Sequence, residues 1–286
     1  MKKLLFQLDT DYIPNTFDTV VAYDGGADHV ISLGGVTPEN VTQLVEGAIY
    51  TRSAKQKKNT ALLVSGSNLV ASVAVFNAIQ KQFFSKFRVS VMLDSNGCNT
   101  TASAAVLQIN KADSLEGKRA IVLGGTGPVG QRIAVLLARE GAIVHISSRK
   151  LERSQEICQT IKEQFDVEII PKVAFSDASM QAALYGMNIV FGTSKSGIRL
   201  LELHHWQSHP AIKYMLDLST QPPLGFDGIK LLDKGAERHG KLIWGGLGIG
   251  AFKLKLHRAC IAHLFTSNDQ ILDIDEIYRI SKEMTL

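Results

Sequence analysis

Short apolar runs alternate with longer segments of helical periodicity along the chain, which is the pattern of an α/β fold. Near the N-terminus, the apolar runs predict strands at residues 3–8, 30–33, 61–65 and 88–93. The periodic segments predict helices over residues 16–24, from Thr37 onward and over 68–83. Runs that are apolar at nearly every position are typical of parallel strands covered on both faces. We therefore expect an α/β domain over residues 1–112.

A polar, turn-rich stretch at residues 113–118 separates this domain from a second succession of strands and helices. The strands are predicted at residues 120–123, 143–146, 167–170, 188–191 and 214–218, with a helix over 131–140. This succession predicts a doubly wound, Rossmann-type domain over residues 113–249. Two further helices, over 250–265 and 273–284, make a C-terminal segment, 250–286, that we expect to return to brace the first domain.

A glycine-rich turn follows the first strand of the second domain and opens its helix. It reads Gly125-Thr126-Gly127-Pro128-Val129-Gly130 and fits the pattern GxGxxG. Glycine lets the backbone approach a pyrophosphate, and the helix N-terminus offers free N–H groups and a positive dipole end. A tight turn without a ligand is the alternative, but the strand and helix on either side favour dinucleotide binding. We also expect Thr193, which follows the strand at 188–191, to bind the cofactor.

The choice of dinucleotide depends on the end of the next strand, where NAD enzymes usually place an acid on the ribose. This chain has Ser148, Arg149 and Lys150 there and no acid. A hydroxyl and two cations suit the 2′-phosphate of NADP, which a carboxylate would repel. The alternative is that the two cations only lie on the surface at the start of a helix, which leaves the missing acid unexplained. We therefore expect NADP.

The helix over 250–265 carries two basic residues on its apolar face. At about 100° per residue, Lys253 and His257 fall within the apolar arc, whereas Lys255 and Arg258 fall opposite. A charged amine and an imidazole on a buried face are costly unless they border a cleft or have partners. A snorkelling lysine and a satisfied core histidine are the alternatives. We predict that Lys253 and His257 belong to the active site.

Two polar segments follow strand ends, where open α/β sheets bind ligands. The first, after the strand at 88–93, contains Asp94, Asn96 and Asn99, and the second contains Gln221. We expect these four residues to bind the substrate. Helix capping by Asn99 and a structural Pro-Pro turn after Gln221 are the alternatives.

Composition limits the remaining possibilities. The 286 residues are 45% apolar and 20% charged, with a net charge of +4, so disorder and a dedicated nucleic-acid binder are both excluded. Three well-separated cysteines, Cys98, Cys158 and Cys260, show no metal or disulfide spacing and indicate a reduced, cytoplasmic setting. Since no apolar run reaches about 18 residues, we expect no membrane span or signal peptide.

The motifs together resemble the bacterial NADP-dependent methylene-tetrahydromethanopterin dehydrogenases, which are similar in fold to methylene-tetrahydrofolate dehydrogenases. The resemblance runs nearly end to end, over residues 17–18, 23–29, 92–97, 99–101, 125–130, 221–225, 247–250 and 253–261. It implies a substrate domain, an NADP domain and a homo-oligomer, either a trimer or a hexamer. From the net charge and the cysteine spacing we expect no nucleic-acid partner and no metal. The family's pterin-site residues fall on Phe17, Thr101, Lys253 and His257.

The reaction that the resemblance implies is reversible hydride transfer from the methylene carbon of a reduced pterin to NADP⁺. Methenyl-pterin and NADPH are the products, and the setting is one-carbon (formaldehyde) metabolism. No proton moves in this step, so the site has to position its reactants and exclude water. One alternative is a methylene-tetrahydrofolate dehydrogenase or an enzyme that uses both carriers. Another is an NADP sensor without catalysis, against which the basic residues on the apolar helix face argue.

Overall fold

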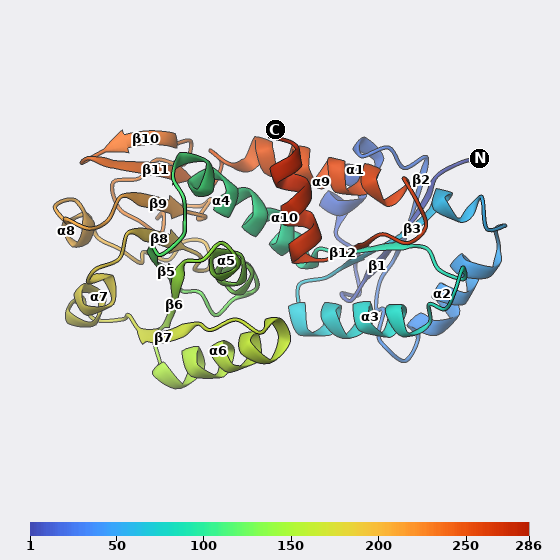
Figure 1. Cartoon of the computed structure of the whole chain (residues 1–286), viewed down its shortest axis with the longest axis horizontal. Coiled ribbons are helices and arrows are strands. Elements are labelled where there is room, and N and C mark those ends of the chain that lie inside the picture. Colours follow the sequence, from blue (N-terminus) through green and yellow to red (C-terminus); the bar gives the residue numbers. More distant parts are fainter. Residues whose placement is uncertain (286) are drawn as a thin grey trace. The chain divides into compact units, whose positions relative to one another are not determined.

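The computed structural model describes residues 1–285, and its two sheets belong to two units that are considered separately (Figure 1). The first unit comprises residues 1–101 and the chain from residue 253 onward, and the second comprises residues 102–252. Helices α4 (Cys98–Ala112) and α9 (Gly250–Leu264) each run from one unit into the other. The α/β class expected from the sequence is confirmed.

The first unit contains a five-stranded parallel sheet in the order β12-β4-β3-β1-β2. Its strands are β1 (Leu4–Asp9), β2 (His29–Leu33), β3 (Thr60–Ser65), β4 (Ser90–Leu93) and β12 (Ile271–Leu272). Its helices, besides parts of α4 and α9, are α1 (Thr16–Asp24), α2 (Val41–Tyr50), α3 (Leu69–Lys81) and α10 (Ile274–Glu283), with short 3-10 turns at Lys57–Asn59 and Ser95–Gly97.

Alternate side chains of these strands supply two cores, one on each face of the sheet. Leu5, Leu63 and Met92 pack with apolar residues of α9 and α10. Leu62 and Val64 point to the other face and pack with α2 and α3. Since a strand turns successive side chains to opposite faces, a fully apolar strand such as β3 needs cover on both sides. The C-terminal helices α9 and α10 provide this cover on one face of the first sheet.

The second unit contains a seven-stranded sheet in the order β10-β11-β9-β8-β5-β6-β7, in which only β10 is antiparallel. Its strands are β5 (Arg119–Leu123), β6 (Ile143–Ser148), β7 (Ile170–Val173), β8 (Ile189–Gly192), β9 (Tyr214–Asp217), β10 (Lys234–Arg238) and β11 (Lys241–Gly245). The helices are α5 (Pro128–Arg139), α6 (Leu151–Phe165), α7 (Asp177–Leu184) and α8 (Leu203–Trp206). The parallel strands follow the Rossmann order, in which the order of strands reverses at β5: β6 and β7 lie on one side of β5, and β8 and β9 lie on the other.

Three features differ from the sequence-based expectation. The unit boundary lies inside α4, at residues 101/102, rather than in the turn at 113–118, because one continuous helix carries the chain across. Strand β7 lies about three residues later than predicted and includes Pro171, which an edge strand tolerates. The β10–β11 hairpin was not predicted. None of the helices within residues 1–285 has both the length and the apolar character of a membrane span.

Candidate active site

The glycine-rich turn forms a phosphate cradle between β5 and α5. A Cβ on Gly125 would lie 2.7 Å from the Val122 carbonyl oxygen, and one on Gly130 would lie 2.6 Å from the Gly125 Cα. Those two glycines therefore allow the strand, turn and helix to pack closely. A Cβ on Gly127 would meet no protein atom within 4 Å. Gly127 thus leaves open space at the N-cap of α5, where backbone N–H groups can bind an anion.

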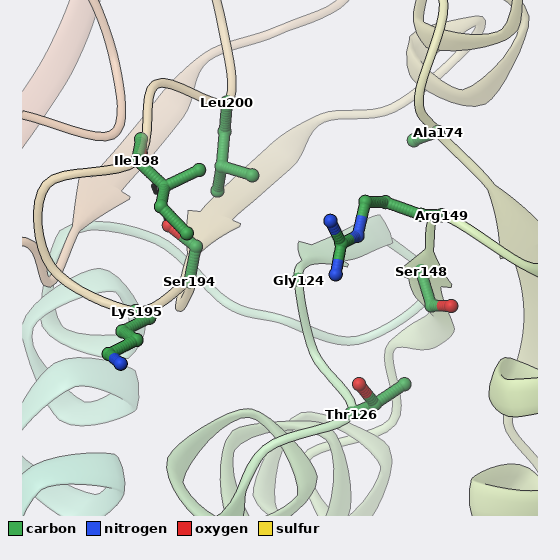
Figure 2. A pocket seen from close by; sticks show the side chains of 9 residues that line it. All are labelled: Gly124, Thr126, Ser148, Arg149, Ala174, Ser194, Lys195, Ile198 and Leu200. Atoms are coloured by element: carbon green, nitrogen blue, oxygen red, sulfur yellow. Dashed lines mark hydrogen bonds between the residues drawn. The ribbon is translucent and has the colours of Figure 1, made fainter.

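A cavity of about 320 Å³ lies beside this cradle at the carboxyl ends of the strands (Figure 2). Arg149 extends its guanidinium into it from the end of β6, toward the loop that carries Gly124. Lys195 adds a second cation. The lining residues are Gly124, Thr126, Ser148, Arg149, Ala174, Ser194, Lys195, Ile198 and Leu200. Position, size and charge suit the adenosine and pyrophosphate part of a dinucleotide.

Two residues expected at this site make hydrogen bonds within the fold. The Ser148 hydroxyl donates to the Lys150 carbonyl (2.7 Å) and accepts from the Lys150 N–H (3.1 Å). Thr193 donates its hydroxyl to the Leu123 carbonyl (3.1 Å), which ties β8 to β5. Ser194 and Lys195, which follow Thr193, line the cavity instead. The sequence offered no signal for these two, because they lie in an irregular loop.

A second polar cluster lies in the first unit, where α1 and α9 meet the end of β4. Asn15 caps α1 by accepting the Phe17 N–H (2.9 Å), which places Phe17 in the first turn. The Lys253 ammonium lies 4.3 Å from the centre of the Phe17 ring, in cation–π contact. A Cβ on Gly97 would come within 2.9 Å of the Lys253 Nζ, so glycine makes room for this amine. Phe17 remains 44% exposed, which leaves ring surface for a ligand.

The imidazole of His257 is fully buried behind this pair. Its ring centre lies 6.3 Å from that of Phe17, and its Nδ1 lies 3.8 Å from Asp94 Oδ2. Neither ring nitrogen has a hydrogen-bond partner among residues 1–285. Burial, assisted by the nearby Lys253 charge, lowers the pKa of His257 to about 4 although Asp94 opposes this shift. His257 is therefore neutral at physiological pH, and it is not the satisfied core histidine of the alternative interpretation.

Asp18 belongs to the same cluster, although it was not predicted as a site residue. Its carboxylate is buried, and neither oxygen has a hydrogen-bond partner in the described part of the chain. Burial and the neighbouring Asp94 raise the pKa of Asp18 to about 7, while Lys253 acts in the opposite direction. The sequence held a signal for it, because Asp18, Val21 and Ala22 share one helix face. An acid on an apolar face is costly unless it has a partner or borders a site.

The polar segment after β4 mainly builds the start of α4. Asp94 accepts the backbone N–H groups of Asn99 (2.8 Å) and Thr100 (3.2 Å), together with the Thr100 hydroxyl (2.7 Å). Asn99 donates its amide to the Leu93 carbonyl and to Asp273. Both residues are buried. Asn96 is exposed with φ of +48°, and Thr101 is half-buried in the first turn of α4.

Gln221 belongs to the second unit, in the loop after β9. Asp217 anchors this loop by accepting the backbone N–H groups of Ser219 (3.1 Å) and Phe226 (3.0 Å). Gln221 itself is exposed. The capping carboxylate, with a pKa raised by burial, thus holds the loop that presents Gln221.

One group of side chains outside these clusters has the composition of a metal site. Asp177 Oδ1 lies 2.9 Å from His204 Nε2 and 2.8 Å from His205 Nε2. However, the Nδ1 of His205 accepts the Glu202 N–H (3.1 Å), so its Nε2 carries the proton. This arrangement favours hydrogen bonding between histidine and carboxylate over metal coordination.

A Rossmann unit with an open phosphate cradle, joined to a second α/β unit, is the architecture of many nicotinamide-dependent oxidoreductases. Residues 16–96 match the family described as "Methylene-tetrahydromethanopterin dehydrogenase, N-terminal". The chain is 50% identical over 285 residues to the bifunctional protein MdtA of Methylorubrum extorquens, a match that covers 99% of both chains. It therefore belongs to the methylene-tetrahydromethanopterin dehydrogenase family and is an oxidoreductase, as the resemblance implied.

A second relative from Methylorubrum extorquens, the NAD(P)-dependent methylenetetrahydromethanopterin dehydrogenase, is 25% identical over 94% of both chains. Among solved structures, quinate dehydrogenase from Corynebacterium glutamicum matches 100% of this chain and 99% of its own, with a TM-score of 0.51 and 11% identity. Methylenetetrahydrofolate dehydrogenase-cyclohydrolase from Trypanosoma brucei matches 99% of this chain and 87% of its own, with a TM-score of 0.50 and 12% identity. At these identities the two structures support the fold alone.

Proposed function

We propose that this protein is an NADP-dependent methylene-tetrahydromethanopterin dehydrogenase. It would transfer a hydride reversibly from the methylene carbon of the reduced pterin to NADP⁺. The observation that carries the proposal is the full-length 50% identity to MdtA, combined with an open cradle at Gly127 in a cationic cavity. The relative named as NAD(P)-dependent supports the same reaction class.

NADP fits the second unit on the evidence of its own side chains. The open space at Gly127 accepts the pyrophosphate, and Arg149 and Lys195 supply positive charge beside it. Arg149 and Lys150 stand at the end of β6, where no carboxylate opposes a 2′-phosphate. Bound NADP⁺ supplies the hydride acceptor. Ser148 contributes by shaping the loop, because its hydroxyl is bonded to Lys150.

The cluster around Lys253 is the proposed pterin site. Phe17 offers a half-exposed ring for packing, while the Lys253 ammonium lies over that ring, in reach of a ligand carbonyl. Thr101 offers a hydroxyl. His257 supports Phe17 as a neutral imidazole and so adds no positive charge near a substrate that becomes a cation. We also propose four residues on the substrate side: Asp94, Asn96, Asn99 and Gln221. Asp94 and Asn99 would act by holding the start of α4 in place.

The second candidate carrier is tetrahydrofolate. The two methylene carriers share the reacting carbon and differ in the contacts of ring and tail. We propose in addition that the protein works as a homo-oligomer. Its three cysteines are buried and far apart in the sequence, which supports a cytoplasmic setting.

The test is a direct assay of NADPH formation with purified protein. Methylene-tetrahydromethanopterin and methylene-tetrahydrofolate are supplied in turn, each with NADP⁺ and with NAD⁺. We expect turnover with the first carrier and a preference for NADP⁺ of about tenfold or more, which is about 1.4 kcal/mol. Turnover with tetrahydrofolate alone would support the second candidate. Tight NADP binding without turnover on either carrier would indicate an NADP sensor rather than an enzyme.

A further inference from the structure

A second cavity, of about 460 Å³, lies next to the first in the Rossmann unit and shares Arg149 with it. Its lining residues are Arg149, Lys150, Arg153 and Phe175. Three of the four are cations and none is acidic, so the cavity has the charge of an anion site. Its single apolar residue is an aromatic ring.

The backbone at this cavity adds to its preference for anions. Helix α6 begins beside it, with Lys150 as the N-cap, and the Lys150 side chain makes no capping hydrogen bond. The first N–H groups of this 15-residue helix therefore lack a side-chain acceptor at the cap, and they carry the positive end of the dipole. Arg153 lies in the first turn, and its guanidinium bonds Glu156 at 3.1 Å. That pair is solvent-exposed, so it holds the guanidinium only weakly.

Phe175 is the other unusual residue of the cavity, because its side chain is 72% exposed. It follows β7, and its backbone N–H donates to the Ser179 hydroxyl (2.9 Å) in the turn that opens α7. The backbone at this position is thus held in place while the ring lies open to solvent. A held, exposed aromatic ring beside a cation cluster is suited to stack against a nucleic-acid base.

We infer that this second cavity binds the adenosine 2′-phosphate end of NADP, with Arg153 as a phosphate ligand and Phe175 as the adenine platform. The inference rests on the proposed use of NADP and adds two residues to it. Arg149 borders both cavities, which places it where the ribose would join the pyrophosphate to the 2′-phosphate. Lys150 and the open N-terminus of α6 complete the phosphate contacts.

The two residues have separable roles under this inference. Arg153 would contact only the 2′-phosphate, which NAD lacks, so it would discriminate between the coenzymes. Phe175 would contact the adenine, which both coenzymes carry, so it would contribute affinity without discrimination. A purely structural role for Arg153 predicts no such discrimination between the coenzymes.

Calorimetric titration of the full-length protein with NADP, NAD, 2′,5′-ADP and 5′-AMP tests this division. Arg153→Ala should weaken NADP and 2′,5′-ADP by about tenfold and leave NAD and 5′-AMP within about twofold. Phe175→Ala should weaken all four by about fivefold. Two control variants should leave the affinity for all four ligands unchanged. Arg279→Ala breaks a comparable exposed pair with Glu283, and Tyr185→Ala removes another exposed ring.

The outcomes separate this inference from the proposed function. If the parent protein binds NADP and turns over but Arg153→Ala binds it unchanged, the phosphate assignment is wrong and the function stands. An equal loss of NAD and NADP in Arg153→Ala contradicts it as well. If Phe175→Ala binds all four ligands normally, the adenine platform is wrong. A parent that binds neither NADP nor 2′,5′-ADP would overturn the proposed coenzyme itself.

Discussion

Replacing the buried Asp18 tests whether the first unit holds a protonated carboxylic acid at neutral pH. The pKa of this carboxyl changes from an ordinary 3.8 to about 7 on folding, mainly through burial and the neighbouring Asp94. Between these two pH values the folded protein keeps a proton that the unfolded chain has lost. The folded state therefore binds more protons, and the Asp18 contribution makes the free energy of unfolding fall as pH rises. Over the whole range this amounts to about 4 kcal/mol, at about 1.36 kcal/mol per pH unit.

His257 contributes a slope of the opposite sign over much of this range. Its pKa is lowered from 6.5 to about 4, so below pH 6.5 the unfolded chain takes up a proton that the folded protein does not. The parent protein alone can therefore show little net dependence on pH. The informative quantity is the free energy of unfolding of Asp18→Asn minus that of the parent.

This difference should rise by about 4 kcal/mol in total from below pH 4 to about pH 8 and stay constant at higher pH. Urea unfolding at intervals of half a pH unit measures it. The buried amide adds a cost of about 1 to 3 kcal/mol that does not depend on pH and shifts the curve without changing its slope. Asp18→Leu, with a different offset, should show the same slope. A difference that does not change with pH would refute the protonated carboxyl.

Three further predictions concern the two clusters. Lys253→Ala should lower kcat/KM by about one to three orders of magnitude, or about 1.4 to 4 kcal/mol, in the methylene-pterin assay. The exposed Lys255 on the same helix is the control, and its alanine variant should stay within about threefold; the reverse result would refute the placement of the site. Gly127→Ala should keep the stability of the parent, because its Cβ meets no protein atom, yet weaken NADP and NAD alike by about tenfold in equilibrium titrations. Gly47→Ala, whose Cβ is equally unobstructed in α2, should bind normally, and equal binding by both variants would contradict the cradle. His257 should lower the free energy of unfolding of the parent by about 3 kcal/mol as the pH falls from 6.5 to 4. His257→Leu should not show this loss, and urea unfolding again measures it as the difference from the parent.

Local patterns in the sequence were sufficient for most of the parallel strands and for the phase of α9. The 3.6-residue period placed His257 on the buried face and Lys255 on the exposed face, and the structure has both there. The GxGxxG turn likewise predicted its own position between β5 and α5. Both inferences succeed because helical phase and strand-to-helix turns depend on neighbours within a few residues.

Only the tertiary structure decided which polar residues are free to meet a ligand. Asp94, Asn99, Ser148 and Thr193 are all candidate site residues, and the structure shows that each makes hydrogen bonds within the fold. A residue's type and spacing are the same whether its side chain caps a helix or contacts a substrate. The choice depends on which donors and acceptors the folded chain brings within about 3 Å, and those are set by packing.

Long-range assembly also lies beyond what local patterns determine. Phe17 and Lys253 are more than two hundred residues apart in the sequence, yet they meet because α9 returns to the sheet that α1 covers. The nucleotide cavity similarly draws Ala174, Lys195 and Ile198 from irregular loops that carry no periodic signal. Sequence periodicity determines which face of each element is buried, whereas the packing of those faces against one another determines which loops and side chains surround the same space.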